Sequence, residues 1–315
     1  FNGCTGLTEL EIPETVKKLE DSSFEACTGL QHVSILGTET LLSKKPFLNA
    51  GAEDSVIEFN QASCVGAAYS NFANAILSPN VTEIGVSCFE RNNVISEKTI
   101  TGGENVLKIG NNAFKLCVGV TDIPFKDTIT YLGNNSFTGT GLKSISLCED
   151  QLSSLKYIGK QAFSKCESLE RVSIGDKVEG VTFGHGLFYG SGSPTATLYV
   201  YSDVVTPDAS YDIGTFEDST FASVVLGEEF DECWGRVFKQ ASFDAIEFQC
   251  PTFSYFGTES FYNCDAPAIF TLPPTTTRIR SKAFASIYST EVRVPRSAQL
   301  DSGAFGTITK YTYYN

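Results

Sequence analysis

Residues 1–24 read FNGCTGLTELEIPETVKKLEDSSF, a copy of a unit that recurs along the whole chain. The unit begins at Phe1 and the next begins at Phe24, so the two phenylalanines stand 23 residues apart. A repeat of this length is typical of a solenoid, in which each unit buries its apolar side only against its neighbours. The same phase is marked later by Phe114, Phe137, Phe163, Phe188, Phe238, Phe261, Phe284 and Phe305.

Each unit contains an apolar pattern of the form L-x-x-L-x-I, which in the first copy is Leu7, Leu10 and Ile12. The last two positions alternate with polar residues, the period of a short strand with one buried face. A second apolar pair, such as Val16 and Leu19, predicts another short strand on the far side of the same core. The first pattern returns at Leu30-Val33-Ile35, Val120-Ile123-Phe125, Leu142-Ile145-Leu147, Leu169-Val172-Ile174 and Phe221-Val224-Leu226.

A turn precedes each phenylalanine. Glycine is frequent four residues before it, where either a positive φ or close backbone packing would favour glycine. The residue directly before the phenylalanine is usually small, as Ala162 is before Phe163. We therefore expect a short helical or 3₁₀ turn that carries the ring inward. The glycines at this position are Gly85, Gly110, Gly133, Gly159, Gly184 and Gly257.

The unit resembles the BspA-like leucine-rich repeat, which reads roughly C-x-x-L-x-x-I-x-I-P-x-x-V-x-x-I-G-x-x-A-F-x-x-C. Residues 4–16 read CTGLTELEIPETV and residues 158–166 read IGKQAFSKC, and the likeness covers nearly all of the chain. The resemblance implies a right-handed leucine-rich-repeat solenoid of short parallel strands joined by short helical or 3₁₀ turns. The asparagine that follows the strand in better-known leucine-rich repeats is mostly missing, so we expect no asparagine ladder.

The repeats predict one elongated domain over residues 1–315, built of roughly thirteen units. Two stretches are irregular, near residues 48–75 and 189–216. In the first, either Ala68-Tyr69 or Phe72 could take the place of the repeat phenylalanine. Because solenoid ends normally need polar caps and this chain opens inside a unit, we expect it to be a segment of a longer protein.

Composition limits the classes of partner. The chain has 23 basic and 37 acidic residues and a net charge of −14, which argues against nucleic acid as a partner. No apolar run is long enough to insert this segment into a membrane. The ten cysteines follow the repeat rather than a metal-site spacing. Cys4, Cys27, Cys117, Cys166 and Cys264 stand three residues after a phenylalanine, where Thr140 and Ser191 stand elsewhere, so we expect small, buried and reduced thiols.

Signs of catalysis or of a bound metal are weak. The two histidines, His32 and His185, are best read as solvent-facing. The acidic residues at 228–232 lack the spacing of a calcium loop and are best read as solvated surface. No phosphate-binding loop, metalloprotease or nucleophile-elbow motif occurs. We therefore expect no enzyme activity, no cofactor and no metal.

The resemblance implies an extracellular, cell-surface adhesion module that binds host matrix or cell-surface proteins. A passive spacer and a carbohydrate-binding or carbohydrate-processing domain are the alternatives. The candidate protein-binding residues are Tyr199, Tyr201 and Tyr211, within the Gly- and Pro-containing segment 190–214. The competing interpretation is that residues 198–201 form a repeat strand whose alternate side chains belong to the core.

Overall fold

The computed structural model describes residues 1–126, 128–148, 152–203, 213–306 and 310–315. These residues form a solenoid of parallel strands with about 13 turns. Phe1–Leu142 with Ser154–Phe163 form one compact unit, and Lys143–Ser153 with Ser164–Asn315 form the other. The two are described separately below as the first and second units.

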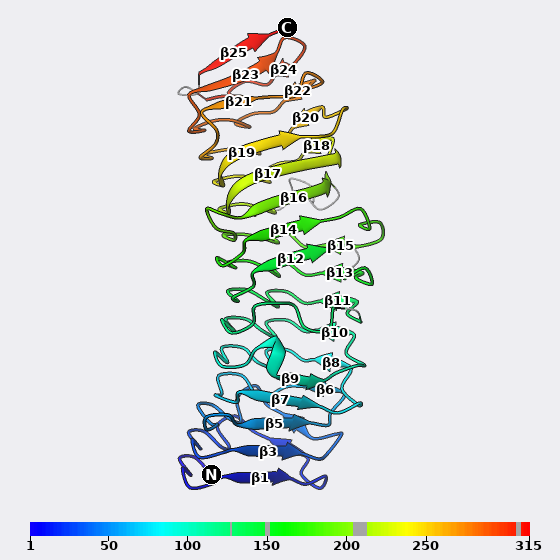
Figure 1. Cartoon of the computed structure of the whole chain (residues 1–315), viewed down its shortest axis with the longest axis vertical. Coiled ribbons are helices and arrows are strands. Elements are labelled where there is room, and N and C mark those ends of the chain that lie inside the picture. The colour runs from blue at the N-terminus through cyan, green and yellow to red at the C-terminus, as the bar shows by residue number, and fades with distance from the viewer. Residues whose placement is uncertain (127, 149–151, 204–212, 307–309) are drawn as a thin grey trace. The chain divides into compact units, whose positions relative to one another are not determined.

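Most turns of the first unit contribute a long strand and a short strand (Figure 1). The long strands pair in parallel in chain order: β1 (Glu9–Ile12), β3 (His32–Ile35), β5 (Val56–Phe59), β7 (Asn74–Leu77) and β9 (Ile100–Gly102). The short strands are β2 (Lys18–Leu19) paired with β4 (Leu41–Leu42), then β6 (Ser63–Cys64), β8 (Glu83–Ile84), β10 (Lys108–Ile109), β11 (Tyr131–Leu132) and β13 (Tyr157–Ile158).

The second unit repeats this arrangement. Its long strands form a five-stranded sheet of β12 (Ser144–Leu147), β14 (Arg171–Ile174), β16 (Thr197–Ser202), β17 (Thr220–Glu229) and β19 (Ser242–Phe248). A three-stranded sheet follows, with β21 (Ile269–Thr271), β23 (Glu291–Pro295) and β25 (Tyr311–Tyr314). The short strands are β15 (Thr182–Phe183), β18 (Glu232–Cys233), β20 (Tyr255–Phe256), β22 (Arg278–Ile279) and β24 (Gln299–Leu300).

The repeat phenylalanines form buried ring stacks inside each unit, as the periodicity predicts. In the first unit, Phe114 stacks on Phe137 with ring centroids 5.3 Å apart, and Phe137 stacks on Phe163 at 5.8 Å. In the second unit the stack runs through Phe188, Phe216, Phe238, Phe261, Phe284 and Phe305. These rings are at most 3% exposed. Phe1 is the exception, with 79% of its surface exposed.

The phenylalanines lie in runs of β-turns, which differs from the expected helical or 3₁₀ turn. Around Phe114, the N–H of Ala113 donates to the carbonyl of Gly110, and the N–H of Cys117 donates to that of Phe114. Asn112 and Leu116 have φ angles of 56° and 61°, a left-handed conformation that stops a helix from propagating. The one helical element that lies wholly within the described residues is the 3₁₀ turn η1 (Glu97–Thr99).

The glycines four residues before the phenylalanines are needed for close packing. None of Gly85, Gly110, Gly133, Gly159 and Gly257 has a positive φ. A Cβ at Gly133 would lie 2.5 Å from the backbone of Gly110 and Asn111 in the preceding turn. Glycine is therefore favoured at this position because neighbouring backbones approach closely, and not because φ is positive.

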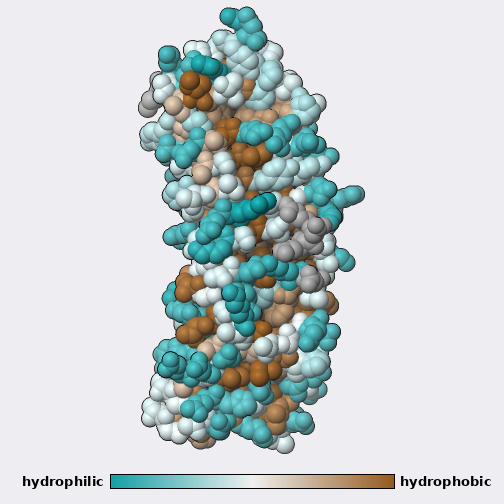
Figure 2. Space-filling view, in the orientation of Figure 1, coloured by the Kyte–Doolittle hydropathy of each residue, from teal (hydrophilic) through white to brown (hydrophobic). Residues whose placement is uncertain are grey.

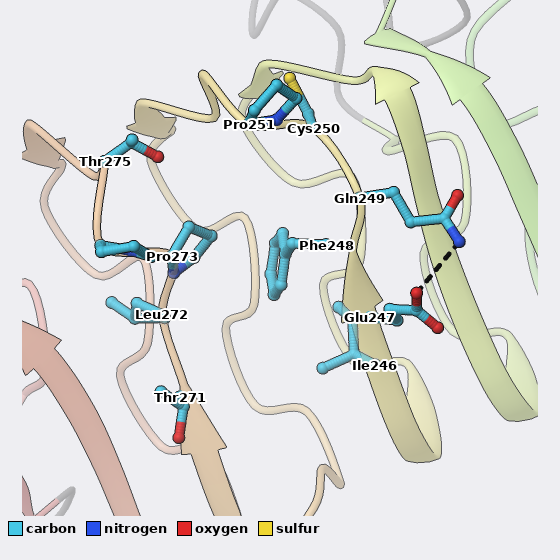
Figure 3. A pocket seen from close by; sticks show the side chains of 11 residues that line it. Ile246, Glu247, Phe248, Gln249, Cys250, Pro251, Thr271, Leu272, Pro273 and Thr275 are labelled. Atoms are coloured by element: carbon cyan, nitrogen blue, oxygen red, sulfur yellow. Dashed lines mark hydrogen bonds between the residues drawn. The ribbon is translucent and has the colours of Figure 1, made fainter.

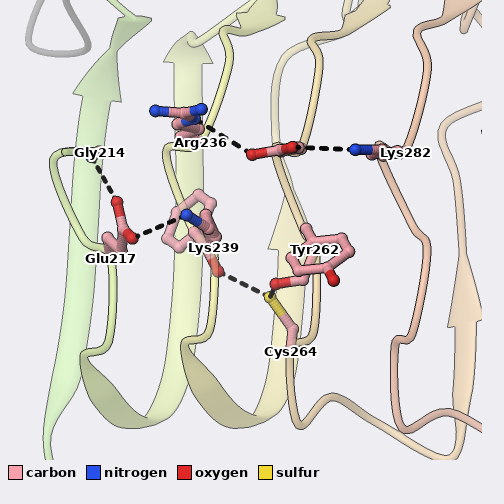
Figure 4. A network of polar contacts seen from close by, with 9 residues as sticks. Gly214, Glu217, Arg236, Lys239, Tyr262, Cys264 and Lys282 are labelled. Atoms are coloured by element: carbon pink, nitrogen blue, oxygen red, sulfur yellow. Dashed lines mark hydrogen bonds and ion pairs between the residues drawn. The ribbon is translucent and has the colours of Figure 1, made fainter. Parts of the chain in front are cut away.

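The cysteine position has a role beyond its small size. In the first unit the thiol of Cys117 donates to the carbonyl of Phe89, at 2.8 Å. In the second unit the thiol of Cys264 donates to the carbonyl of Phe238, at 2.6 Å (Figure 4). Nearby ion pairs in the same view are Glu217–Lys239 and the group Arg236–Glu259–Lys282. Each thiol thus satisfies a carbonyl in the preceding turn. All ten cysteines are free thiols in the structure.

The first irregular stretch is a short turn. The residues Val56 and Asn74 pair side by side, although they are only 18 positions apart. Phe72 is fully buried, with its ring edge-on to Phe47 at 5.6 Å, whereas Tyr69 lies outside under the ammonium of Lys45. Phe72 therefore supplies the buried ring of this turn, whereas Ala67 stands at the backbone position of a repeat phenylalanine: the N–H of Ser70 donates to its carbonyl as that of Cys117 does to Phe114.

The expected strand through Val120, Ile123 and Phe125 does not form. Pro124 has no N–H to donate to a ladder, and Phe125 has a φ of 59° within a turn. The sheet of long strands in the first unit consequently ends at β9. The other long strands predicted by the apolar pattern are present, among them β1, β3, β12, β14 and β17.

Candidate binding face

The outer face of the long-strand sheet in the second unit carries two of the three candidate tyrosines. Residues 197–202 form β16, in which Leu198 and Val200 point into the core. Tyr199 and Tyr201 alternate with them and lie half-exposed on the outer side. The strand interpretation of this segment is therefore confirmed, and the core side chains are the two aliphatic residues rather than the tyrosines.

Tyr199 extends over the neighbouring strand at a glycine. In the ladder, Tyr199 stands between Ser173 of β14 and Val225 of β17. A Cβ on Gly227 would lie 2.9 Å from the hydroxyl of Tyr199 and 2.9 Å from the Cα of Tyr201. Gly227 therefore provides the space in which the phenol hydroxyl lies.

Tyr201 borders a surface hollow of about 440 Å³ at the carboxyl end of β16 and β17. Glu228, Glu229, Gln249 and Pro251 line the rest of this hollow. Desolvation, followed by the charge and the hydrogen bond of Glu229, raises the pKa of the Tyr201 phenol. The hydroxyl therefore stays protonated at neutral pH and can donate a hydrogen bond to a carboxylate.

One further group in this region was not anticipated from the sequence. The indole Nε1–H of Trp234 donates to a carboxylate oxygen of Asp203, at 3.2 Å. Burial, followed by the charges of Asp231 and Glu232, raises the pKa of Asp203 to about 6. Trp234 is the one tryptophan of the chain, and its ring lies 5.6 Å from that of Tyr255. A single tryptophan beside an acidic run is the signal that could have pointed to this group.

The remaining candidates do not join this face. Tyr211 lies outside the described residues. His32 is on the outer face of β3 between Glu9 and Glu58, as its strand position predicts, and His185 is half-buried in the turn after Gly184. Within the described part of the chain, no group of three or more His, Cys, Asp or Glu side chains could hold a metal ion.

The sequence matches a known family along almost the whole chain. The BspA type leucine-rich repeat region, in six copies, matches residues 1–103, 94–204 and 200–312. The chain belongs to the BspA-type leucine-rich repeat family. Solenoids of this family are typically non-catalytic interaction folds. No helix among the described residues is long and apolar enough to cross a membrane.

A solved structure has a similar fold. A leucine-rich repeat protein from Bacteroides ovatus is 18% identical, with a TM-score of 0.56, and the match covers 100% of this chain and 86% of that one. A leucine rich cell surface protein from Faecalibacterium prausnitzii is 15% identical, with a TM-score of 0.35, over 98% and 79% of the two chains. No curated protein matches the sequence.

Proposed function

We propose that the chain is a non-catalytic protein-binding module that acts in adhesion at a cell surface. The observation that carries the proposal is the pair Tyr199 and Tyr201, which stand half-exposed on a rigid strand instead of in the core. Tyrosine supplies a large contact area at a modest cost in conformational entropy, and interfaces are enriched in it. Membership of the BspA-type family supports both the interaction role and the proposed location.

A passive spacer would need no such residues. Its outer surface would be satisfied by polar side chains alone, whereas the outer face of β16 adds the half-exposed Tyr199 and Tyr201 to the acidic residues beside it. Exposed aromatic side chains gathered in one part of a folded surface are a mark of binding. The region therefore favours an interaction module.

The proposal is tested by immobilising the chain and measuring its equilibrium binding to a panel of matrix proteins, cell-surface ectodomains and soluble polysaccharides. Saturable binding of at least one protein is the expected result. Binding of no member of the panel would contradict the proposal and favour the spacer. Binding of polysaccharides alone would instead assign the face to carbohydrate.

A further inference from the structure

The long strands of the second unit separate between β19 and β21. β19 is the edge of its five-stranded sheet and β21 is the edge of the following three-stranded sheet. A single bridge joins them at Ser242 and Asp265, where the N–H of Phe243 donates to the carbonyl of Asp265 at 2.9 Å. Beyond this bridge, within the described residues, no backbone hydrogen bond links the two strands.

A cleft of about 480 Å³ lies where the strands separate. Phe248 lies across it from Leu272 and Pro273, and Cys250 and Pro251 stand at one end (Figure 3). Phe248 is only half-buried, although its neighbours in the ring cluster, Phe253 and Phe270, are fully buried. Figure 2 shows hydrophobic surface among hydrophilic residues on this face. The cleft therefore exposes part of the apolar core.

The two strand edges beside the cleft have free hydrogen-bonding capacity. In a parallel ladder, alternate residues direct their backbone groups to opposite sides. The backbone N–H of Gln249 donates to the carbonyl of Leu226 in β17, and the backbone N–H of Leu272 donates to the carbonyl of Arg293 in β23. Both N–H groups therefore point away from the cleft. Their neighbours Phe248 and Thr271 consequently direct their backbone groups toward it. Unpaired strand edges of this kind are templates for an added strand.

Negative charge lies on the β19 side of the cleft. Glu247 lines it and accepts a hydrogen bond from the Gln249 side chain at 3.0 Å, and Gln249 also lines the hollow that holds Glu228 and Glu229. Neither the cleft nor the hollow has a lysine or arginine in its lining. The nearby Arg293, beside Thr271 in the ladder, is paired with Glu291 at 3.5 Å.

A second cleft, in the first unit, gives a comparison for the carboxylate of Glu247. That cleft, of about 460 Å³, lies beside the missing strand near Pro124. There Lys126 pairs with Asp122 at 2.6 Å, and the Glu97 carboxylate accepts hydrogen bonds from the backbone and side chain of Thr121. Asp122 in that cleft is thus paired with a lysine that also lines it, whereas Glu247 accepts a hydrogen bond from a neutral amide.

We propose that the cleft between β19 and β21 binds an extended peptide segment in which basic and apolar residues alternate. Its backbone pairs with the strand edges at Phe248 and Thr271. Because side chains of a strand alternate, one set rests on the half-buried Phe248 while the other lies in the outer row beside Glu247. This inference rests on the proposed protein-binding function and names the chemistry of the partner.

The probe for this site is a short synthetic peptide that alternates valine and lysine. Its affinity for the whole chain is measured by fluorescence anisotropy, together with two matched peptides. One has glutamate in place of lysine, and the other keeps the lysines but is N-methylated at alternate backbone nitrogens. We expect saturable binding of the first peptide only, because the second has the wrong charge and the third has lost its donors to one of the two strand edges.

The matching protein variant is Glu228→Lys combined with Glu247→Lys. It should bind the valine–lysine peptide about tenfold or more weakly, since Glu247 lines the occupied cleft and Glu228 lines the hollow beside it. Glu53→Lys is the control: Glu53 is exposed in the first unit, and its substitution should leave the affinity unchanged. Melting curves establish that each variant is folded.

Three results would overturn the inference: no binding of the valine–lysine peptide, equal binding of its N-methylated form, or an equal loss of affinity in Glu53→Lys. The last two would reduce the interaction to general attraction by a chain of net charge −14. The panel assay of the proposed function is independent of this outcome. If the chain binds proteins in the panel but not the peptide, the proposed function stands and only the proposed role of the cleft is rejected.

Discussion

At the scale of single residues, Asp203 and Trp234 show what repeat periodicity leaves out. They are 31 residues apart and meet at one edge of the second unit. The outward direction of Tyr199 and Tyr201 follows from the period of two along a strand. The pairing of Asp203 with Trp234 does not follow from this period. Asp203 lies directly after the end of a strand, where the repeat does not predict the direction of a side chain.

Asp203 should make folding stability depend on pH. Its pKa is raised from 3.8 to about 6, chiefly by burial. The folded protein therefore holds the proton more tightly than the unfolded chain, so stability falls as pH rises from 3.8 through about 6 and stays lower above that range. Asp203→Asn removes the charge and keeps an acceptor for the indole. It should raise the melting temperature at neutral pH and lose this advantage in acid.

Trp234 reports the same titration. Its fluorescence should change with a midpoint near pH 6, because ionisation places a negative charge beside the indole. In Asp203→Asn this transition should vanish. A flat wild-type titration would contradict the raised pKa of Asp203, and a transition that persists in the variant would show that another group near Trp234 is responsible.

At the scale of elements, the apolar pattern predicted most long strands because their period of two is a direct consequence of one buried face. It was wrong at Val120–Phe125, where Pro124 removes a ladder donor. The turns were also harder to predict. Left-handed residues such as Asn112 and Leu116 are not glycines, so no sequence signal separated a run of β-turns from a helical turn.

The ring stacks should dominate the stability of the turns. Phe163 is fully buried and stacks on Phe137, so Phe163→Ala should cost about 3–5 kcal/mol of unfolding free energy. Tyr201→Ala removes a half-exposed outer side chain and should cost far less. Chemical denaturation of both variants checks the contrast. Similar losses would mean that the rings do not form the core.

The cysteines should be free and protected. Burial raises the pKa of the Cys117 thiol to about 12 and also raises that of Cys264. Buried thiols that stay protonated react slowly. Thiol reagent added without reductant should react with most of the ten only after denaturation. Fewer free thiols in the denatured chain, with the mass loss of bridges, would contradict the reduced state.

At the scale of the whole molecule, the sequence predicted a repeat fold but not its interruptions. Nearest-neighbour stacking makes each turn predictable from its own residues. The cleft at β19 and β21 depends on where two adjacent strands stop pairing, which no single repeat encodes. The same holds for the binding face: composition singled out the segment 190–214, but strand β16 within it positions the tyrosines. Removing residues 191–211 would therefore delete a core strand, and point substitutions are the better test.

The most direct test of the central claim compares two double variants in binding to a protein partner found in the panel. Tyr199→Ser with Tyr201→Ser alters the proposed face in the second unit. Tyr131→Ser with Tyr157→Ser alters a half-exposed tyrosine pair on short strands of the first unit, with rings 4.7 Å apart. The first should weaken binding by about tenfold or more, as expected for interfacial tyrosines, and the second should leave it unchanged. Unchanged binding by the first variant, with both proteins folded, would contradict the account.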